Sequence, residues 1–280
     1  MGKLYIVGTP IGNLEDLSPR AVRILGEVDF IAAEDTRVSV KLLNRFDIKK
    51  PMVSYFEHNK AARGEEIIAR LKNGENCAIV TDAGMPAISD PGEDLVRMCH
   101  ENGVETESVP GPSAVITALA LSGMASGRFC FEGFLSMNKR SRITHLKELM
   151  SERRTMIFYE APHKLLSTLK DMFEHFGERE ICLARELTKL HEEAVRTTFS
   201  AAIEKYTNTA PKGEFVLITA GAKEQETTVH SLEDAIKYAK ELHENGMSAT
   251  AAAKSAAGEF GYKKSDIYIH LAKGGAHDEG

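Results

Sequence analysis

A run of small and turn-forming residues, Thr81–Gly92 (TDAGMPAISDPG), follows directly on the short apolar segment Cys77–Val80. Glycine and proline at this density interrupt both helix and strand, so the run is expected to be a loop that begins where a buried strand ends. In open parallel α/β sheets, ligands bind in the crevice beyond the carboxyl ends of the strands. This loop also carries two carboxylates, Asp82 and Asp90. We therefore expect it to form one side of a binding site.

Short apolar segments alternate with helical patterns on both sides of this loop, which is typical of a parallel sheet built from right-handed βαβ units. The expected strands are Lys3–Val7, Phe30–Ala33, Met52–Tyr55, Cys77–Val80 and Val104–Val109, and helices are expected from Pro19 and over about 38–46, 61–71, 93–101 and 114–121. Each strand closes on a polar cluster, so these clusters should line one rim of the sheet. The turn at Gly8–Leu14 fits neither a dinucleotide fingerprint nor a P-loop.

After residue 123 the expected strands come partly in succession, which predicts a mixed sheet. They are Phe129–Phe134, Thr155–Tyr159, Glu180–Glu186, Glu193–Phe199 and Phe215–Thr219, with helices over about 139–150 and 165–176. Residues 223–230 have the composition of a linker, and three short helices are expected beyond it, over 231–244, 248–260 and 265–271. This last part suits a helix-turn-helix or a plain helical cap. The predicted domains are 1–123 (α/β), 124–222 (mixed α/β) and 230–275 (helical).

Composition narrows the possible classes of protein. The chain has 280 residues and a net charge of −6, so it lacks the overall basic charge of many nucleic-acid-binding domains. A modest basic excess between Arg128 and Lys164 is either a local binding patch or a solvated helix face. No apolar run approaches the ~20 residues needed to cross a bilayer. Four widely separated cysteines predict reduced thiols, and the histidines show no metal spacing, so we expect a cytoplasmic protein without a metal.

Seven motifs in this chain, in order, resemble those of one enzyme family. They are GTPIGNL from Gly8, EDTR from Glu34, TDAGMPAISDPG from Thr81, VPGPS from Val109, FYEAPH from Phe158, RELTKLHE from Arg185 and KGEFV from Lys212. Together they resemble the tetrapyrrole methylase-like (class III) S-adenosylmethionine methyltransferases, and within them the ribosomal RNA small subunit methyltransferase I group. The resemblance covers roughly residues 3–220.

The resemblance implies a homodimer in which S-adenosylmethionine binds in the cleft between two α/β domains. It further implies methyl transfer to the ribose 2′-hydroxyl of a decoding-centre cytidine in 16S rRNA of the small ribosomal subunit. Other members of the wider class methylate corrin and porphyrin precursors, so a small-molecule methyltransferase is an alternative. A third alternative is an RNA-binding assembly factor without catalysis. No membrane and no metal are implied.

The motifs also point to site residues. The expected cofactor-binding residues are Thr9, Pro10, Asp82, Ala83, Gly84, Met85, Ile88, Ser113, Ala114, Tyr159, Ala184 and Gly213. Candidates for the group that removes the hydroxyl proton are Glu160, Glu186, Lys189, His191 and Glu192, and contacts to rRNA are expected from Lys139, Arg140, Arg142 and Arg185. Each has a structural alternative: Asp82 could cap its own loop, Ser113 could cap a helix, and the Glu-Arg-Lys cluster could be a surface ion-pair network.

Overall fold

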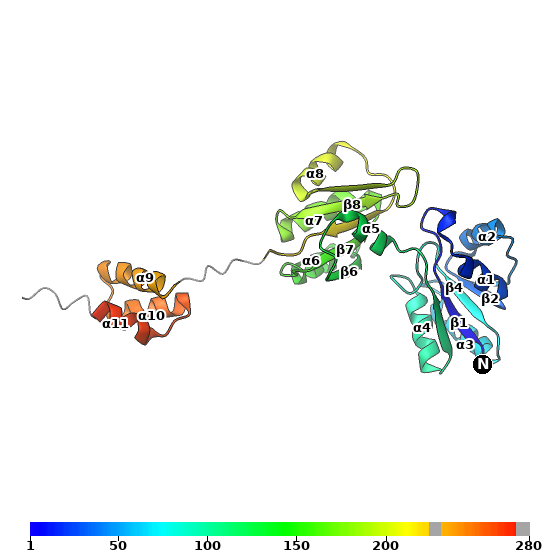
Figure 1. Ribbon diagram of the computed structural model, residues 1–280, viewed down its shortest axis with the longest axis horizontal. Coiled ribbons are helices and arrows are strands. Elements are labelled where there is room, and N and C mark those ends of the chain that lie inside the picture. The colour runs from blue at the N-terminus through cyan, green and yellow to red at the C-terminus, as the bar shows by residue number, and fades with distance from the viewer. Residues whose placement is uncertain (224–230, 273–280) are drawn as a thin grey trace, which may run out of the picture. The chain divides into compact units, whose positions relative to one another are not determined.

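The computed structural model describes residues 1–223 and 231–272 (Figure 1). The chain divides into two compact units, Met1–Ala222 and Lys223–Gly280. The first unit contains two five-stranded sheets and the second is helical. Within the described residues, no helix has the length and apolar character needed to traverse a bilayer.

The first sheet has the strand order β3-β2-β4-β1-β5, and all of its pairs are parallel. Its strands are β1 (Lys3–Val7), β2 (Phe30–Ala33), β3 (Met52–Ser54), β4 (Cys77–Val80) and β5 (Glu105–Val109), which confirms the predicted parallel sheet. The central strand is β4, buried along its whole length. The loop that follows β4 therefore leaves the middle of the carboxyl edge, where ligands of such sheets bind.

Helices cover both faces of this sheet. Leucine, isoleucine and alanine side chains of α1 (Pro19–Glu27) and α2 (Thr36–Arg45) share one core, and those of α3 (Lys60–Lys72) and α4 (Gly92–Glu101) share the other. Helix α1 begins as its sequence predicts: the Ser18 hydroxyl accepts a hydrogen bond from the Ala21 amide at 3.1 Å, and Pro19 is the first helical residue.

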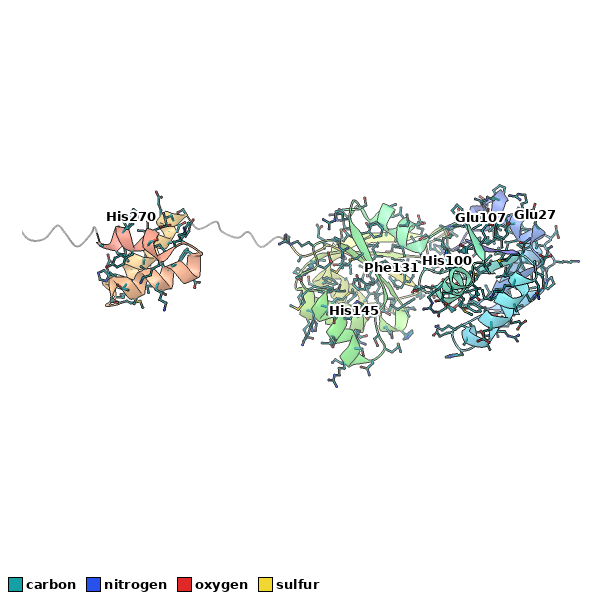
Figure 2. All side chains as sticks on the ribbon, turned by 90° about the horizontal axis from the view of Figure 1, so that it is seen from below. Glu27, His100, Glu107, Phe131, His145 and His270 are labelled. Atoms are coloured by element: carbon teal, nitrogen blue, oxygen red, sulfur yellow. The ribbon has the colours of Figure 1, made fainter. Side chains whose placement is uncertain are left out.

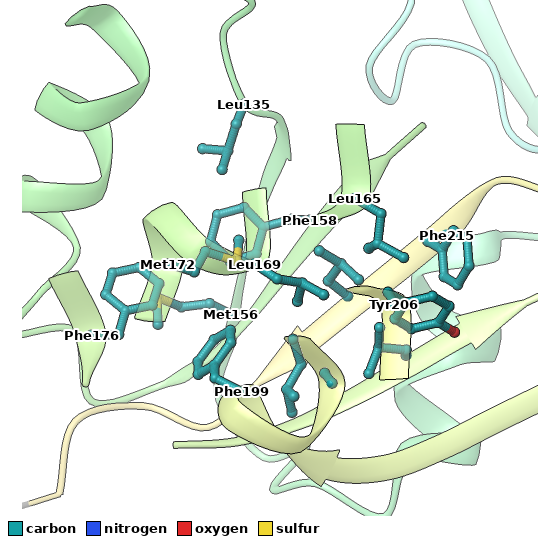
Figure 3. Close-up of a cluster of buried hydrophobic side chains, with 14 of the residues drawn as sticks. Leu135, Met156, Phe158, Leu165, Leu169, Met172, Phe176, Phe199, Tyr206 and Phe215 are labelled. Atoms are coloured by element: carbon teal, nitrogen blue, oxygen red, sulfur yellow. The ribbon is translucent and has the colours of Figure 1, made fainter. Parts of the chain in front are cut away.

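The second sheet has the order β6-β7-β10-β8-β9. Strand β6 (Phe129–Phe134) runs parallel to β7 (Thr155–Glu160), whereas β10 (Phe215–Thr219), β8 (Glu180–Arg185) and β9 (Glu193–Thr198) pair antiparallel. The predicted mixed sheet is thus confirmed. Helices α6 (Lys139–Glu148), α7 (Leu165–Phe176) and α8 (Phe199–Asn208) share one core with it, where aromatic and methionine side chains gather (Figure 3).

Helix α5 (Ala114–Ser122) follows the last strand of the first sheet but packs against the second. Val115, Ala118 and Leu119 share a buried cluster with side chains of β8 and β10, and Figure 1 shows α5 beside β8. This helix is apolar around its whole circumference, a pattern of helices covered on more than one side. It therefore ties the first sheet to the second.

Helix α8 was not predicted from the sequence. The expected strand Glu193–Phe199 ends at Thr198, and Phe199 begins the helix. Phe199, Ala202 and Tyr206 recur at helical spacing and are all buried. The β-branched pair Thr197–Thr198 continued the strand pattern up to the first helical residue. The change from strand alternation to the helical spacing of apolar residues was therefore not recognised in the sequence.

The helical unit consists of α9 (Leu232–Glu244), α10 (Ala249–Phe260) and α11 (Lys264–Ala272), close to the expected ranges. A capping box between Ser231 and Asp234 starts α9, and Gly261 ends α10 in the left-handed conformation. Each helix contacts the other two. Their shared core is built largely from alanine, with Ile267 and Leu271 from α11. Most of the expected linker, and residues 230 and 273–275 of the expected domain, lie outside the described residues.

Candidate active site

A cavity of about 530 Å³ lies in the first unit and is lined by residues of both sheets. One wall comes from the ends of β2 and β4 and the start of α5, and the other from β7, β8, β10 and the loops that follow or precede them. The lining residues are Ile11, Glu34, Thr81–Met85, Ile88–Asp90, Ser113, Ala114, Phe134, Tyr159, Glu160, Ala184–Leu187, Lys189 and Gly213–Val216. This volume is in the usual range for small-molecule and cofactor sites.

The loop 81–92 is held in shape by its own polar groups. The Asp90 carboxylate accepts hydrogen bonds from the backbone amides of Ala87 (3.0 Å), Ile88 (3.4 Å) and Gly92 (2.8 Å). Ala87 and Ser89 both have positive φ, 68° and 82°, which is uncommon for residues with a side chain. Burial raises the pKa of Asp90, while the three amides oppose that change. Asp90 therefore shapes the loop.

The same loop is anchored to the turn after β1. Thr9 and Gly84 exchange two backbone hydrogen bonds, of 2.9 and 3.1 Å, and the Thr9 hydroxyl donates to the carbonyl of Thr81 at 3.2 Å. The motifs GTPIGNL and TDAGMPAISDPG are thus adjacent parts of one wall. Thr9 is buried behind the loop and does not line the cavity.

Two acids from neighbouring strand ends, Glu34 and Asp82, meet on this wall. The Glu34 carboxylate accepts from the Thr81 hydroxyl at 2.6 Å, and Asp82 accepts from the Asp35 amide at 3.1 Å. Burial and the nearby Glu34 charge both raise the pKa of Asp82. Asp82 therefore links two loops instead of capping its own, and it presents a carboxylate that a cation would stabilise.

The opposite wall includes a strained loop after β8. Glu186 and Thr188 have positive φ, 51° and 64°, and for a β-branched residue such as Thr188 this is a genuine outlier. The amide of Thr188 donates to the Glu192 carboxylate at 2.7 Å. A Cβ on Gly12 would lie 2.7 Å from the Leu187 carbonyl oxygen, so the turn after β1 touches this loop. Backbone strain often accumulates at ligand-binding loops.

Aromatic side chains complete the second wall. Tyr159 contacts Phe131, labelled in Figure 2, with ring centroids 5.0 Å apart, and Phe134 with centroids 5.3 Å apart. Burial raises the pKa of the Tyr159 hydroxyl, and a hydrogen bond with the backbone of Val115 opposes this. Tyr159 therefore connects the second sheet with the first turn of α5.

The structure brings together most of the expected cofactor-binding residues. Asp82, Ala83, Gly84, Met85, Ile88, Ser113, Ala114, Tyr159, Ala184 and Gly213 all line the cavity. Thr9 and Pro10 do not. Ser113 is the N-cap residue of α5, but its side chain makes no capping hydrogen bond.

The candidates for proton removal separate into three situations. Glu160 lines the cavity, but the residue is only 3% exposed, and its carboxyl group accepts from the Thr168 hydroxyl at 2.5 Å and the Ala161 amide at 2.8 Å. Glu192 holds the Thr188 amide and, like His191, does not line the cavity. Glu186 and Lys189 both line it and form a partly exposed ion pair at 3.1 Å.

The expected rRNA contacts also differ in their settings. Arg142 is largely buried and pairs with Asp171 at 2.7 Å. Arg185 lines the cavity and pairs with Glu193 at 2.5 Å. Lys139 and Arg140 are exposed in the first turn of α6.

Sequence reasoning missed several lining residues, among them Glu34, Ser89, Phe134 and Glu214. Glu34 lies in the quoted EDTR motif, and only the strand order, which places β2 beside β4, brings it to Asp82. Phe134 ends an expected strand, but nothing in the sequence shows which side of that strand faces the cavity.

Acids outnumber bases on the lining, with six carboxylates (Glu34, Asp82, Asp90, Glu160, Glu186 and Glu214) against Arg185 and Lys189. Such a site favours a ligand that carries positive charge. A larger and more open depression of about 970 Å³ is lined by residues near the starts of β6 and β7, including Arg128 and Thr155. It is at the opposite ends of those strands from the cavity. Across residues 1–223 and 231–272, no group of three or more His, Cys, Asp or Glu is arranged to hold a metal ion.

Comparison with known proteins decides the family. The family described as tetrapyrrole (corrin/porphyrin) methylases matches residues 3–203. The chain belongs to this family. Ribosomal RNA small subunit methyltransferase I of Synechocystis sp. is 47% identical to it over 269 residues, which cover 96% of each chain. The protein of the same name from Thermotoga maritima is 51% identical over 221 residues, 79% of this chain and 99% of the relative.

Solved structures of two proteins with low sequence identity share the fold. Diphthine synthase superposes with a TM-score of 0.63 at 14% identity, over 79% of this chain and 90% of that one. Uroporphyrin-III-C-methyltransferase from Thermus thermophilus superposes with a TM-score of 0.56 at 18% identity, over 78% of this chain and 94% of that one. These likenesses confirm the α/β fold of the first unit. The family and its rRNA-methylating relatives make the chain a methyltransferase.

Proposed function

We propose that this methyltransferase uses S-adenosylmethionine to methylate the ribose 2′-hydroxyl of a decoding-centre cytidine in small-subunit rRNA. The observation that carries the proposal is the acidic cavity between the two sheets, in a chain 43–51% identical to relatives named ribosomal RNA small subunit methyltransferase I. In our proposal the rRNA is recognised within the small subunit, and the protein remains in the cytoplasm.

The lining suits the chemistry of this cofactor, which carries a sulfonium, an ammonium and a carboxylate. Asp82 and Glu34 offer carboxylates to positive charge, and the first turn of α5 offers backbone amides to negative charge. Gly84, with φ of 89°, lets backbone approach a ligand without a side chain between them. When bound, the cofactor supplies an electrophilic methyl group.

Positioning supplies much of the rate in such a transfer, because the reaction is an in-line displacement. The two walls would hold the acceptor hydroxyl against the methyl group and exclude water. The hydroxyl must also lose its proton, and a positioned base contributes ~10²- to 10⁴-fold. We assign this role to Glu186, held by Lys189, because Glu160 and Glu192 use their carboxylates within the protein.

We also propose that the protein works as a homodimer. Helix α5 is apolar all round, yet Ile116 and Leu121 remain about half exposed. A second copy would cover them. Sedimentation equilibrium should give twice the chain mass, and Ile116→Asp should shift the protein to monomer.

The test of function is transfer of tritium from labelled S-adenosylmethionine to small ribosomal subunits from cells that lack this enzyme. The labelled nucleoside is then identified by mass spectrometry. We expect 2′-O-methylcytidine. A methyl group on the base would refute the assigned acceptor, and the absence of any transfer, with naked rRNA tested alongside, would refute the proposed substrate. Glu186→Gln should lower kcat by at least tenfold while cofactor affinity stays the same.

A further inference from the structure

The segment Phe134–Arg140, which joins β6 to α6, presents apolar surface at the mouth of the cavity. Phe134 lines the cavity and is 57% exposed. Three residues on, Met137 is 74% exposed. The Phe134 ring also contacts the Tyr159 ring, with centroids 5.3 Å apart and a tilt of 52° between the planes, and more than half of its residue surface stays exposed. Most of the ring therefore remains available to a ligand that enters the cavity.

This exposure is built into the fold, because buried groups hold the segment from behind. Leu135 is 3% exposed and belongs to the core of the second sheet, whereas Phe134, the last residue of β6, contacts Tyr159 of the cavity lining. Arg142 donates to the carbonyls of Ser136 (3.1 Å) and Met137 (3.5 Å) while its ion pair with Asp171 fixes it to α7. A segment whose backbone is held in this way is pre-organised to contact a ligand.

The charges that follow the segment favour an anion. Lys139 and Arg140 stand in the first turn of α6, which contains no acid, and neither has an ion-pair partner within the described residues. Cations at a helix N-terminus are unfavourable because the amides there already carry partial positive charge. An anionic ligand would offset both the charges of Lys139 and Arg140 and the partial positive charge of the helix amides. Helix stability therefore does not explain these residues, whereas phosphate binding does.

We propose that the segment Phe134–Arg140 is the acceptor-strand clamp: a nucleobase of single-stranded RNA stacks on Phe134, and Lys139 and Arg140 contact flanking phosphates. This inference rests on the proposed function and deepens it. An exposed aromatic ring beside unpaired cations is the combination that single-stranded RNA recognition uses. The clamp adjoins the cavity, so the stacked base would place its ribose beside the reacting methyl group.

The test compares Phe134→Ala and Phe134→Tyr with Phe173→Ala, an exposed phenylalanine on α7 outside the cavity. The probe is a short fluorescein-labelled single-stranded RNA, followed by anisotropy without cofactor, together with kcat/KM on small subunits. Loss of stacking should lower RNA affinity and kcat/KM by about 10- to 100-fold in Phe134→Ala. The tyrosine variant and Phe173→Ala should stay near wild type.

The cations are tested by salt dependence. Lys139→Ala combined with Arg140→Ala should reduce the slope of log affinity against log salt by about 1.4, the value for two contacts to single-stranded phosphates. Lys147→Ala, on a later turn of α6, is the matched control and should leave the slope unchanged.

Calorimetry with S-adenosylmethionine separates the possible failures. Unchanged cofactor affinity in Phe134→Ala, with weaker RNA binding, supports the clamp. Weaker cofactor binding with unchanged RNA affinity would make Phe134 a cofactor wall and overturn it. RNA affinity and kcat/KM equal to wild type would also overturn it. If wild-type protein fails to methylate subunits, the proposed function falls, while the anisotropy series still tests the clamp.

Discussion

The acidic residues on the cavity lining have different roles, and their hydrogen bonds distinguish those that bind groups of the protein from those available to a ligand. Asp90 and Glu160 are committed to groups of the protein, three backbone amides in one case and the Thr168 hydroxyl in the other. Within the described residues, the Asp82 carboxylate accepts one hydrogen bond, from the Asp35 amide, and Asp82 lines the cavity. Of these three acids, Asp82 is therefore the one best placed to stabilise a bound cation.

Binding of S-adenosylmethionine should strengthen as pH rises through the pKa of Asp82. Burial and Glu34 raise this pKa above the usual 3.8, so the group is protonated and neutral at a pH where an ordinary aspartate is charged. Below that pKa the cation loses its partner, and above it the attraction is complete. Calorimetry across the acidic range, in two buffers of different ionisation enthalpy, should show weaker binding at low pH and proton release near the pKa.

Asp82→Asn provides the control, because an amide oxygen can still accept from the Asp35 backbone. The variant should bind the cofactor about 10- to 150-fold more weakly at neutral pH, corresponding to ~1.5–3 kcal/mol for a hydrogen bond to a charged group. Its affinity should also change less with pH. Wild-type affinity and an unaltered pH profile in this variant would show that Asp82 only supports the loop.

Glu160 is expected to matter for stability. Thr168→Val removes the hydroxyl that donates to Glu160 at 2.5 Å, where both side chains are at most 3% exposed. A buried carboxyl oxygen that loses its donor costs ~1–3 kcal/mol of unfolding free energy. Urea denaturation followed by circular dichroism measures this in a chain without tryptophan. The control Thr207→Val, which removes an exposed hydroxyl bonded within α8, should change stability by less than about 0.5 kcal/mol.

The sequence indicated which residues line the cavity better than it indicated the role of each side chain there. Short motifs at strand ends singled out Asp82–Met85 and Ser113, which do lie on the cavity lining, because the ends of parallel strands converge on one rim. Glu160 and Glu192 could not be separated from Glu186, since their hydrogen bonds depend on distant groups or on the path of a loop. Phe134 was missed because β6 has a register irregularity between Phe131 and Gly133, so simple alternation along the strand does not show which face Phe134 occupies.

At the scale of elements, the first wall depends on a close approach between the turns that follow β1 and β5. A Cβ on Gly111 would lie 2.9 Å from backbone atoms of Gly8, and one on Gly8 would lie 2.7 Å from the Gly111 Cα. No side chain fits between these turns. Since only Pro112 separates Gly111 from Ser113 and the start of α5, this crossing also sets the position of α5 against the cavity.

Gly111→Ala should therefore destabilise the protein by ~1–3 kcal/mol, the usual effect of overpacking a tight contact. Cofactor affinity should fall as well, because the start of α5 must shift. Gly26→Ala, in the last turn of α1, is the matched control: its new methyl group meets nothing within 4 Å, and replacing this helical glycine should stabilise by up to ~0.5–1 kcal/mol. Urea denaturation compares the two. Equal effects in both variants would contradict the role given to the crossing.

Helices and strands were predicted well where the spacing of apolar residues and the turn residues at the ends indicated the same element. They were predicted poorly where these two signals differed. The strands of the first sheet were recovered because each is short, apolar and followed by a turn. Helix α8 was lost where Thr197–Thr198 prolonged the strand pattern. The attachment of α5 to the second sheet follows from its fully apolar surface, but its partner could be known only from the fold.

The whole molecule combines a large unit that contains the cavity with a small helical one. The helical core rests on Ala235, Ala239, Ala252, Ala253 and Ala256, whose small side chains let helices pack closely but bury little apolar area each. The alignment with the Thermotoga maritima relative spans 221 residues and 99% of that protein, about the length of Met1–Ala222. The Thermotoga maritima relative thus has no room for a second unit of this size beyond the aligned part.

A chain that ends at Ala222 should fold and bind S-adenosylmethionine with the affinity of the full-length protein, since every residue of the cavity lies before that point. Calorimetric unfolding of the full chain should show two transitions, of which only the cofactor-responsive one survives in the truncated chain. With small subunits as substrate, KM should rise while kcat holds, because α11 begins at the exposed Lys264 and exposes Tyr268 and Ile269, and aromatic and cationic side chains are those that bind single-stranded RNA. Loss of cofactor affinity on truncation would show that the helical unit supports the cavity. Unchanged KM would remove it from RNA binding and leave recognition to the first unit.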